Sequence, residues 1–232
     1  MKKPPVTDSA EAGRAYGGRS LDERRRHRRA QFVAAGIEVF GREGYRGATV
    51  KALCRQAGLT ERYFYESFGN SESLFAEVYK TLVARLQHDV VAAIDRAPQD
   101  AESTARAGLR VFFETMYEQP GTARILLIEI FGISGEIDKL YRSTTQNFTR
   151  MLAELVSAIF PLEAAGPTDP AIVSTGLVGS TIHIAMYWTL SRYRDPLNVV
   201  VESSLALYVA VARQMAAPEK GATADDADDA AS

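Results

Sequence analysis

A short stretch of the chain concentrates side chains that can read the edges of DNA bases. Residues 61–67 hold Arg62, Tyr63 and Tyr65 together with two glutamates. A guanidinium can donate paired hydrogen bonds to guanine N7 and O6, and Tyr63 can pack on a thymine methyl group or bond a base edge. Glu61 can accept from cytosine, although a solvated helix face explains this residue equally well. These residue types therefore favour contact with nucleic acid.

Two short helices would position these side chains. The first carries an apolar stripe at i, i+3, i+4 and i+7, made by Val50, Leu53, Cys54 and Ala57. Thr49 precedes this helix as an N-cap, and Gly58 can end it in a left-handed conformation. Thr60 then caps a second helix, with Phe64 and Phe68 on its inner side. The pattern predicts a helix-turn-helix, and an ordinary helical hairpin is the alternative that periodicity alone leaves open.

Charge is distributed unevenly along the chain of 232 residues, although its net value is only −2. Residues 1–68 carry 14 Lys and Arg against 8 Asp and Glu, whereas residues 69–232 carry 13 against 21. A basic run at residues 24–29 stands just before the motif and predicts an arm that contacts phosphates or the minor groove; the solvated start of a helix is the alternative. A basic end on an acidic chain favours polyanion binding at that end.

Composition bounds the class of protein. Charged residues make up 24% of the chain and hydrophobic residues 46%, which is typical of a soluble globular protein. The single cysteine, Cys54, excludes an internal disulfide and is expected in the core. The first 18 residues lack the apolar segment of a secretory signal, so we expect a cytoplasmic protein.

Helical patterns fill most of the chain, and no strand pattern is convincing. We expect an all-α fold of about nine helices, in which a three-helix head at residues 21–70 joins a larger body at residues 71–217. Disorder is expected in a basic arm, residues 1–20, and in an acidic tail, residues 218–232. The expected helices are 21–42, the two of the motif, 71–96 with Ser71 as its cap, 101–118, a short buried helix within 123–135, 136–160, 171–191 and 196–215.

One of these helices is unusually apolar. Residues 171–191 contain no Asp, Glu, Lys or Arg over 21 positions, a length that can span a bilayer. Seven Ser, Thr and His side chains argue against a membrane span. We expect instead a helix that is buried on nearly all sides in a dimer, with Gly176 and Gly179 allowing another helix to approach closely.

The chain from Gln31 to Leu74 resembles the DNA-binding domain of the tetracycline-repressor (TetR) family of transcription regulators. The match is gapless and includes Ala34, Ala35, Phe40, Gly44, Tyr45, Thr49, Val50, Ala57, Gly58, Leu59, Thr60, Phe64, Tyr65, Phe68 and Leu74. The family usually has His where this chain has Ser67, and often Lys where it has Ser71. Both changes remove cationic contacts, but serine hydroxyls and the N–H groups at a helix start can still hold a phosphate.

The resemblance implies a homodimer that binds a palindromic operator on double-stranded DNA. The residues expected to contact DNA are Arg28, Arg29, Arg46, Thr49, Lys51, Thr60, Glu61, Arg62, Tyr63, Tyr65, Ser67 and Ser71. The last two long helices of each subunit would form the dimer interface. The helix from Ser71 would transmit the signal of a bound effector.

A small, mostly hydrophobic effector is expected in the body and would release a repressor from DNA. Its candidate contacts, each of which a plain core role also explains, are Tyr117, Phe131, Phe148, His183, Tyr187 and Trp188. We expect no cofactor and no metal, because three histidines are scattered and no ligand cluster has metal-binding spacing. Two other readings remain: a helical interaction module that has lost DNA binding, and, more remotely, an enzyme that uses the same cavity.

Overall fold

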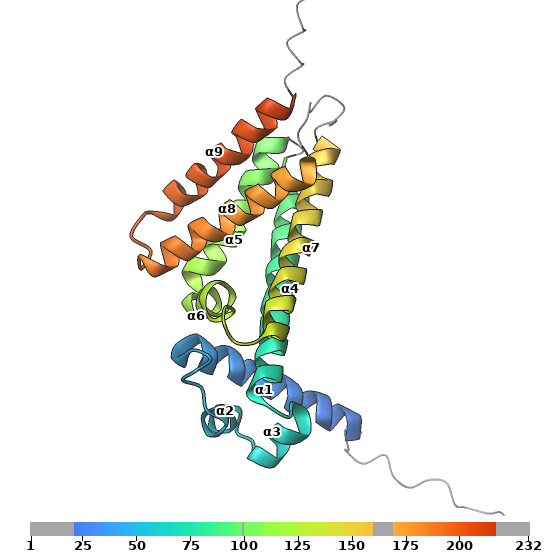
Figure 1. Cartoon of the computed structure of the whole chain (residues 1–232), viewed down its shortest axis with the longest axis vertical. Coiled ribbons are helices and arrows are strands. Elements are labelled where there is room, and N and C mark those ends of the chain that lie inside the picture. The colour runs from blue at the N-terminus through green and yellow to red at the C-terminus, as the bar shows by residue number, and fades with distance from the viewer. Residues whose placement is uncertain (1–20, 99, 160–168, 217–232) are drawn as a thin grey trace, which may run out of the picture.

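The chain folds into a small helical head and a larger helical body (Figure 1). The structure is a computed structural model that describes residues 21–98, 100–159 and 169–216. All regular elements within these ranges are helices, which confirms the predicted fold class. They are α1 (Leu21–Glu43), α2 (Val50–Ala57), α3 (Glu61–Ser67), α4 (Ser71–Arg96), α5 (Ala101–Glu118), α6 (Pro120–Arg124), the π-helical turn η1 (Ile125–Glu129), α7 (Gly135–Ile159), α8 (Pro170–Leu190) and α9 (Leu197–Ala216). The expected arm and acidic tail lie outside the described residues.

The predicted short helix within residues 123–135 is wrong in its bounds. Pro120 occupies the first turn of α6, where its fixed φ suits a helix start and its missing N–H is not needed. The helix therefore begins before the apolar run. It then widens into η1 and stops before Gly132, whose φ is +74°.

An aromatic cluster holds the head together. The ring of Phe32 in α1 meets those of Phe64 and Phe68 edge-on, at centroid distances of 5.5 and 6.3 Å. All three side chains are buried. Because Phe64 anchors one side of α3, the opposite side of this short helix must face away from the head.

The helix ends of the head agree with prediction in part. Thr49 Oγ1 accepts the Ala52 amide at 3.1 Å, and Gly58 has a φ of +67°. Thr60 stands at the predicted N-cap position of α3, although its side chain makes no capping hydrogen bond. The predicted cap at Ser71 is wrong. Asn70, not Ser71, caps α4, because its Oδ1 accepts the Ser73 amide at 2.8 Å.

Two glycines meet where the head joins the body. A Cβ on Gly41 of α1 would lie 2.8 Å from the Cα of Gly121 in α6. Such a distance is well inside van der Waals contact, so the two helices cross backbone to backbone. A side chain at Gly41 would therefore require one of the helices to move, and a Cβ on Gly121 would make a tight contact of 3.3 Å with the Gly41 Cα.

A pair of charged side chains, which we call the junction clamp, spans the same contact. It consists of Arg124 and Glu129, joined by an Arg124 Nε to Glu129 Oε1 hydrogen bond of 2.9 Å. Arg124 also donates to the carbonyl of Arg42 at the end of α1, at 2.8 Å. The other carboxylate oxygen of Glu129 accepts the Tyr45 amide at 2.8 Å. The clamp thus holds the C-terminal end of α1 and the loop that follows it.

The body is arranged around α4, which continues from the head along α5 and α7 (Figure 1). The start of α4 packs under α1, since a Cβ on Gly36 would lie 2.7 Å from Val78 Cγ2. A second tie reaches the same helix from the body, where Ser134 Oγ donates to Glu72 Oε1 at 2.7 Å. Helix α4 therefore contacts both the head and the interior of the body.

Helix α8 is only partly buried in the single chain. It is the one helix among the described residues that is long and apolar enough to cross a membrane, a test that a core helix also passes. Ile172, Tyr187 and Leu190 of α8 are exposed, as are Val199 and Leu207 of α9. These side chains form an apolar surface over the last two helices.

We predict that Gly41→Ala destabilises the protein, because the new methyl group meets the Gly121 backbone. Overpacking of this kind costs about 1–3 kcal/mol in the free energy of unfolding, to be measured by urea denaturation. Gly135→Ala is the matched control, because its Cβ would meet nothing within 4 Å. An equal effect of the two substitutions would contradict the close contact.

Candidate DNA-binding surface and effector cavity

The free side of α3 presents the side chains that the sequence singled out. Glu61, Arg62, Tyr63 and Tyr65 are all exposed, while Phe64 between them is buried. The helix lies at the end of the molecule remote from α9 (Figure 1). Its polar and aromatic side is therefore accessible to a large partner such as a duplex.

Arg62 is held along its own helix. Its Nε donates to Glu66 Oε1 at 2.9 Å, and the arginine side chain is 83% exposed. The hydrogen bond to Glu66 is the largest cause that raises the pKa of Arg62, so the group stays charged. An exposed ion pair of this kind is weak. Arg62 can therefore exchange Glu66 for another acceptor.

The basic run before the motif is helical and belongs to the first turns of α1. The Arg28 guanidinium lies 4.5 Å from the centre of the Tyr63 ring, which brings a positive charge beside α3. Arg29 has a different role. It donates to the Ser67 carbonyl at 2.8 Å, pairs with Glu77 at 3.1 Å and lies 4.2 Å over the Phe68 ring.

Arg29 therefore ties α1 to the end of α3 and to α4. The sequence assigned both Arg28 and Arg29 to DNA, and in this geometry Arg29 makes structural contacts within the protein. No local sequence signal distinguishes it from Arg28, because only the position of Glu77 on α4 decides which arginine is paired.

The remaining predicted contacts surround α2 and α3. Arg46, Lys51 and Thr60 are exposed, and the Thr60 hydroxyl makes no capping bond. Ser67 Oγ donates to the Tyr63 carbonyl at 2.7 Å, so its proton is used within α3. Ser71, in the first turn of α4, is half-buried.

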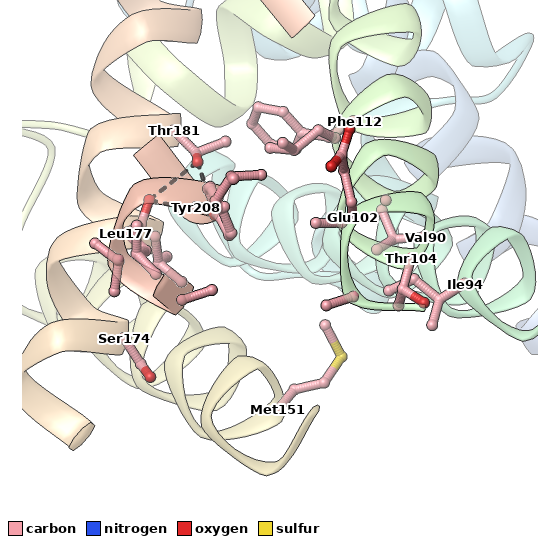
Figure 2. Close-up of a pocket in the computed structure, with 18 of the residues that line it drawn as sticks. Val90, Ile94, Glu102, Thr104, Phe112, Met151, Ser174, Leu177, Thr181 and Tyr208 are labelled. Atoms are coloured by element: carbon pink, nitrogen blue, oxygen red, sulfur yellow. Dashed lines mark hydrogen bonds between the residues drawn. The ribbon is translucent and has the colours of Figure 1, made fainter. Parts of the chain in front are cut away.

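A cavity of about 390 Å³ lies in the body between α4, α5, α7, α8 and α9 (Figure 2). Pockets for small ligands commonly have volumes of roughly 300–1,000 Å³. Apolar side chains supply most of the wall, among them Val90, Ile94, Leu109, Phe112, Met151 and Val178. Within the described ranges, no group of three His, Cys, Asp or Glu side chains could hold a metal ion.

Four hydroxyl side chains interrupt the apolar wall, those of Thr104, Ser174, Thr181 and Tyr208, and the last two form a pair. Thr181 Oγ1 and Tyr208 Oη lie 2.9 Å apart, and Thr181 also donates to the Leu177 carbonyl at 2.9 Å (Figure 2). Burial raises the pKa of the Tyr208 phenol, and the bond to Thr181 lowers it by less. The phenol therefore remains neutral at physiological pH.

Only one of the six predicted effector contacts, Phe148, lines this cavity. Tyr117, Phe131, His183 and Tyr187 are exposed elsewhere. Trp188 is buried in an aromatic cluster, stacked on Tyr117 at 5.7 Å and donating its indole N–H to the Asp195 carbonyl at 2.8 Å. Thr181 and Tyr208 were missed, since a hydroxyl on an apolar helix gives no sign in the sequence of which partner it faces.

Comparison with known proteins identifies the family. Residues 32–78 match the model described as bacterial regulatory proteins, tetR family. The HTH-type transcriptional regulator EthR of Mycolicibacterium smegmatis is 24% identical over 167 residues, which cover 72% of this chain and 76% of EthR. The HTH-type transcriptional regulator BetI of Rhizobium meliloti is 30% identical over 95 residues, covering 41% of this chain and 46% of BetI.

A solved structure shares the fold over most of the chain. The transcriptional regulator FadR of Bacillus subtilis, in complex with stearoyl-CoA, superimposes with a TM-score of 0.70 at 18% identity, over 78% of this chain and 97% of that one. The fold and the helix-turn-helix together define a DNA-binding transcription regulator. Residues 32–78 thus match the TetR family, and the chain is similar to an HTH-type transcriptional regulator over 72% of its length.

We predict that Arg29→Ala lowers the stability of the protein. Three contacts that join α1, α3 and α4 are lost together, and the melting temperature should fall by about 2–4 °C. Arg25→Ala, on the exposed part of the same helix, is the control and should leave the melting temperature unchanged. If Arg29→Ala melts like the wild type, then the contacts do not stabilise the head.

Proposed function

We propose that this protein is a dimeric, ligand-responsive repressor of transcription that binds a palindromic operator in the cytoplasm. The observation that carries the proposal is the exposure of Arg62, Tyr63 and Tyr65 on α3 while Phe64 fixes that helix to the head. A helix of this size fits the major groove with its side chains on the base edges. Residues 21–70 would form the DNA-binding domain and residues 71–217 the effector-binding and dimerisation domain.

Phosphate contacts would surround the reading helix. Arg28, Arg46 and Lys51 place positive charge beside α3 and α2, and the hydroxyls of Thr49, Thr60, Tyr65, Ser67 and Ser71 are further candidates. Glu61 and Glu66 lie on the same helix, and repulsion from phosphate would restrict the orientations in which α3 can enter the groove.

The apolar surface of α8 and α9 supports a dimer formed through these two helices. Its exposed side chains, Ile172, Tyr187, Leu190, Val199 and Leu207, lack cover in the single chain. Gly176 and Gly179 leave open space above α8, since a Cβ on either would meet nothing within 4 Å. A partner helix can therefore approach closely, and two heads related by a two-fold axis would require a palindromic site.

The effector would act through α4. Val90 and Ile94 of this helix line the cavity, and Leu74 and Val78 pack beneath α1 in the head. The dimer would have one conformation in which the spacing of its two heads fits the operator and another in which it does not. An effector that binds the second conformation more tightly lowers the population that can bind DNA. The apolar wall of the cavity supports a mostly hydrophobic effector, and the similar fold of FadR, solved with stearoyl-CoA, agrees with that class.

We expect Arg62→Ala to weaken operator binding about tenfold to a hundredfold and to relax preference at one base pair, because a bidentate guanine contact is lost. Fluorescence anisotropy with promoter fragments at two salt concentrations would measure both effects. Arg110→Ala is the matched control, since Arg110 forms an equivalent exposed pair with Glu114 in the body.

The same assay separates the alternatives. If Arg62→Ala weakens binding to all sequences equally, then Arg62 is a phosphate contact. Tyr65→Phe is expected to show this uniform weakening, because Tyr65 is a candidate phosphate contact. Flat, non-selective binding by the wild-type protein would instead favour a helical interaction module that has lost DNA binding.

Gly179→Arg should convert the dimer to monomers and abolish tight operator binding. The long side chain has space in the single chain, so the monomer folds, but it blocks a facing helix. Sedimentation velocity would report at least a tenfold weaker self-association. Gly135→Arg, at the start of α7 and away from α8 and α9, should remain dimeric; equal dimerisation of both variants would contradict this interface.

A further inference from the structure

We propose that the cavity takes an uncharged, largely aliphatic molecule that carries one hydroxyl group, and that this hydroxyl donates to Tyr208 Oη. This inference rests on the proposed function, because it names the chemical class of the effector. It arises from the distribution of polar atoms on the wall and from the direction of the hydrogen bonds in the Thr181–Tyr208 pair.

The first step concerns charge. Among the described residues that line the cavity, only Glu102 and Arg213 are charged, and both are exposed. Glu102 is already paired with Arg106 at 2.8 Å. A carboxylate or ammonium group carried past these two exposed side chains into the apolar part of the cavity would lose its hydration without gaining a charged partner, which is strongly unfavourable. The part of the ligand that enters this apolar part is therefore uncharged.

The second step concerns the direction of the hydrogen bonds. Thr181 has one hydroxyl proton, and it is donated to the Leu177 carbonyl at 2.9 Å. Tyr208 must then donate to Thr181 Oγ1 at 2.9 Å, because its other acceptor, the Leu177 carbonyl, is more distant at 3.4 Å. The phenol oxygen keeps its lone pairs. Tyr208 Oη can therefore accept a hydrogen bond, and a ligand that binds it must supply a hydrogen-bond donor.

The third step concerns position. Thr181 and Tyr208 come from α8 and α9, and Phe112 of α5 lies across the cavity from them (Figure 2). Val90 and Ile94 from α4, with Met151 from α7, supply further apolar wall. A hydroxyl bound to Tyr208 fixes one end of the ligand, and the aliphatic part then lies against α4, the helix that reaches the head.

Calorimetric titration of the full chain, without DNA, tests this with three ten-carbon probes. Decan-1-ol supplies the donor, decan-2-one supplies only an acceptor, and decanoate is charged at pH 7.5. We expect decan-1-ol to bind roughly threefold to tenfold more tightly than decan-2-one, which is the range for one hydrogen bond, and decanoate to bind weakest. Equal or tighter binding of either decan-2-one or decanoate, or no binding of decan-1-ol, would overturn the proposal.

Two variants test the anchor itself. Tyr208→Phe removes the acceptor and should weaken decan-1-ol roughly threefold to tenfold while leaving decan-2-one unchanged. Tyr193→Phe is the matched control, because that phenol donates to the Met116 carbonyl at 2.9 Å and does not line the cavity. Unchanged decan-1-ol affinity in Tyr208→Phe would refute the anchor.

If Tyr208→Phe fails to fold, the variant Thr181→Val tests whether Tyr208 anchors the ligand. It removes the nearer acceptor for the Tyr208 proton but leaves the Leu177 carbonyl at 3.4 Å to accept that proton, so Tyr208 Oη remains the acceptor for the ligand. Decan-1-ol should therefore still bind more tightly than decan-2-one, and loss of this preference would refute Tyr208 as the anchor. Since these titrations contain no DNA, their failure leaves the Arg62→Ala result untouched, and failure of operator binding leaves the ligand class untouched.

Discussion

The orientation of the head on the body depends on one close contact between two backbones. A Cβ on Gly41 would lie only 2.8 Å from the Gly121 Cα, and the junction clamp of Arg124 and Glu129 secures the same crossing with three hydrogen bonds. Packed contacts of this kind resist gradual deformation, since protein interiors are close-packed. A change inside the body must therefore move the head as a unit or leave it in place.

The two candidate sites use opposite physical chemistry. On α3 the charged groups are hydrated, and the Arg62–Glu66 pair is held weakly enough to be exchanged. In the cavity the polar atoms are few and their bonds are directional. Contact with DNA would accordingly depend on ionic strength, whereas effector choice would depend on shape and on a small number of hydrogen bonds.

The sequence predicted elements well and contacts across elements poorly. The bounds of α1, α4 and α5 follow from periodicity and breakers, and the glycine turn at Gly58 was correct. The cap at Ser71 was wrong because Asn70, one residue earlier, takes the N-cap position of α4. Arg29, Thr181 and Trp188 acquire their partners from helices distant along the chain, and no local pattern encodes those partners.

The π-helical turn at Ile125–Glu129 has a consequence for how this lineage can change its length. A π turn contains one residue more than an α turn. Deleting a residue there would restore the ordinary winding, and because the wider turn absorbs the extra residue, Glu129 would keep nearly the same direction relative to α6 and to the Tyr45 amide. This turn is therefore a place where the chain can lose one residue while the link between head and body is kept.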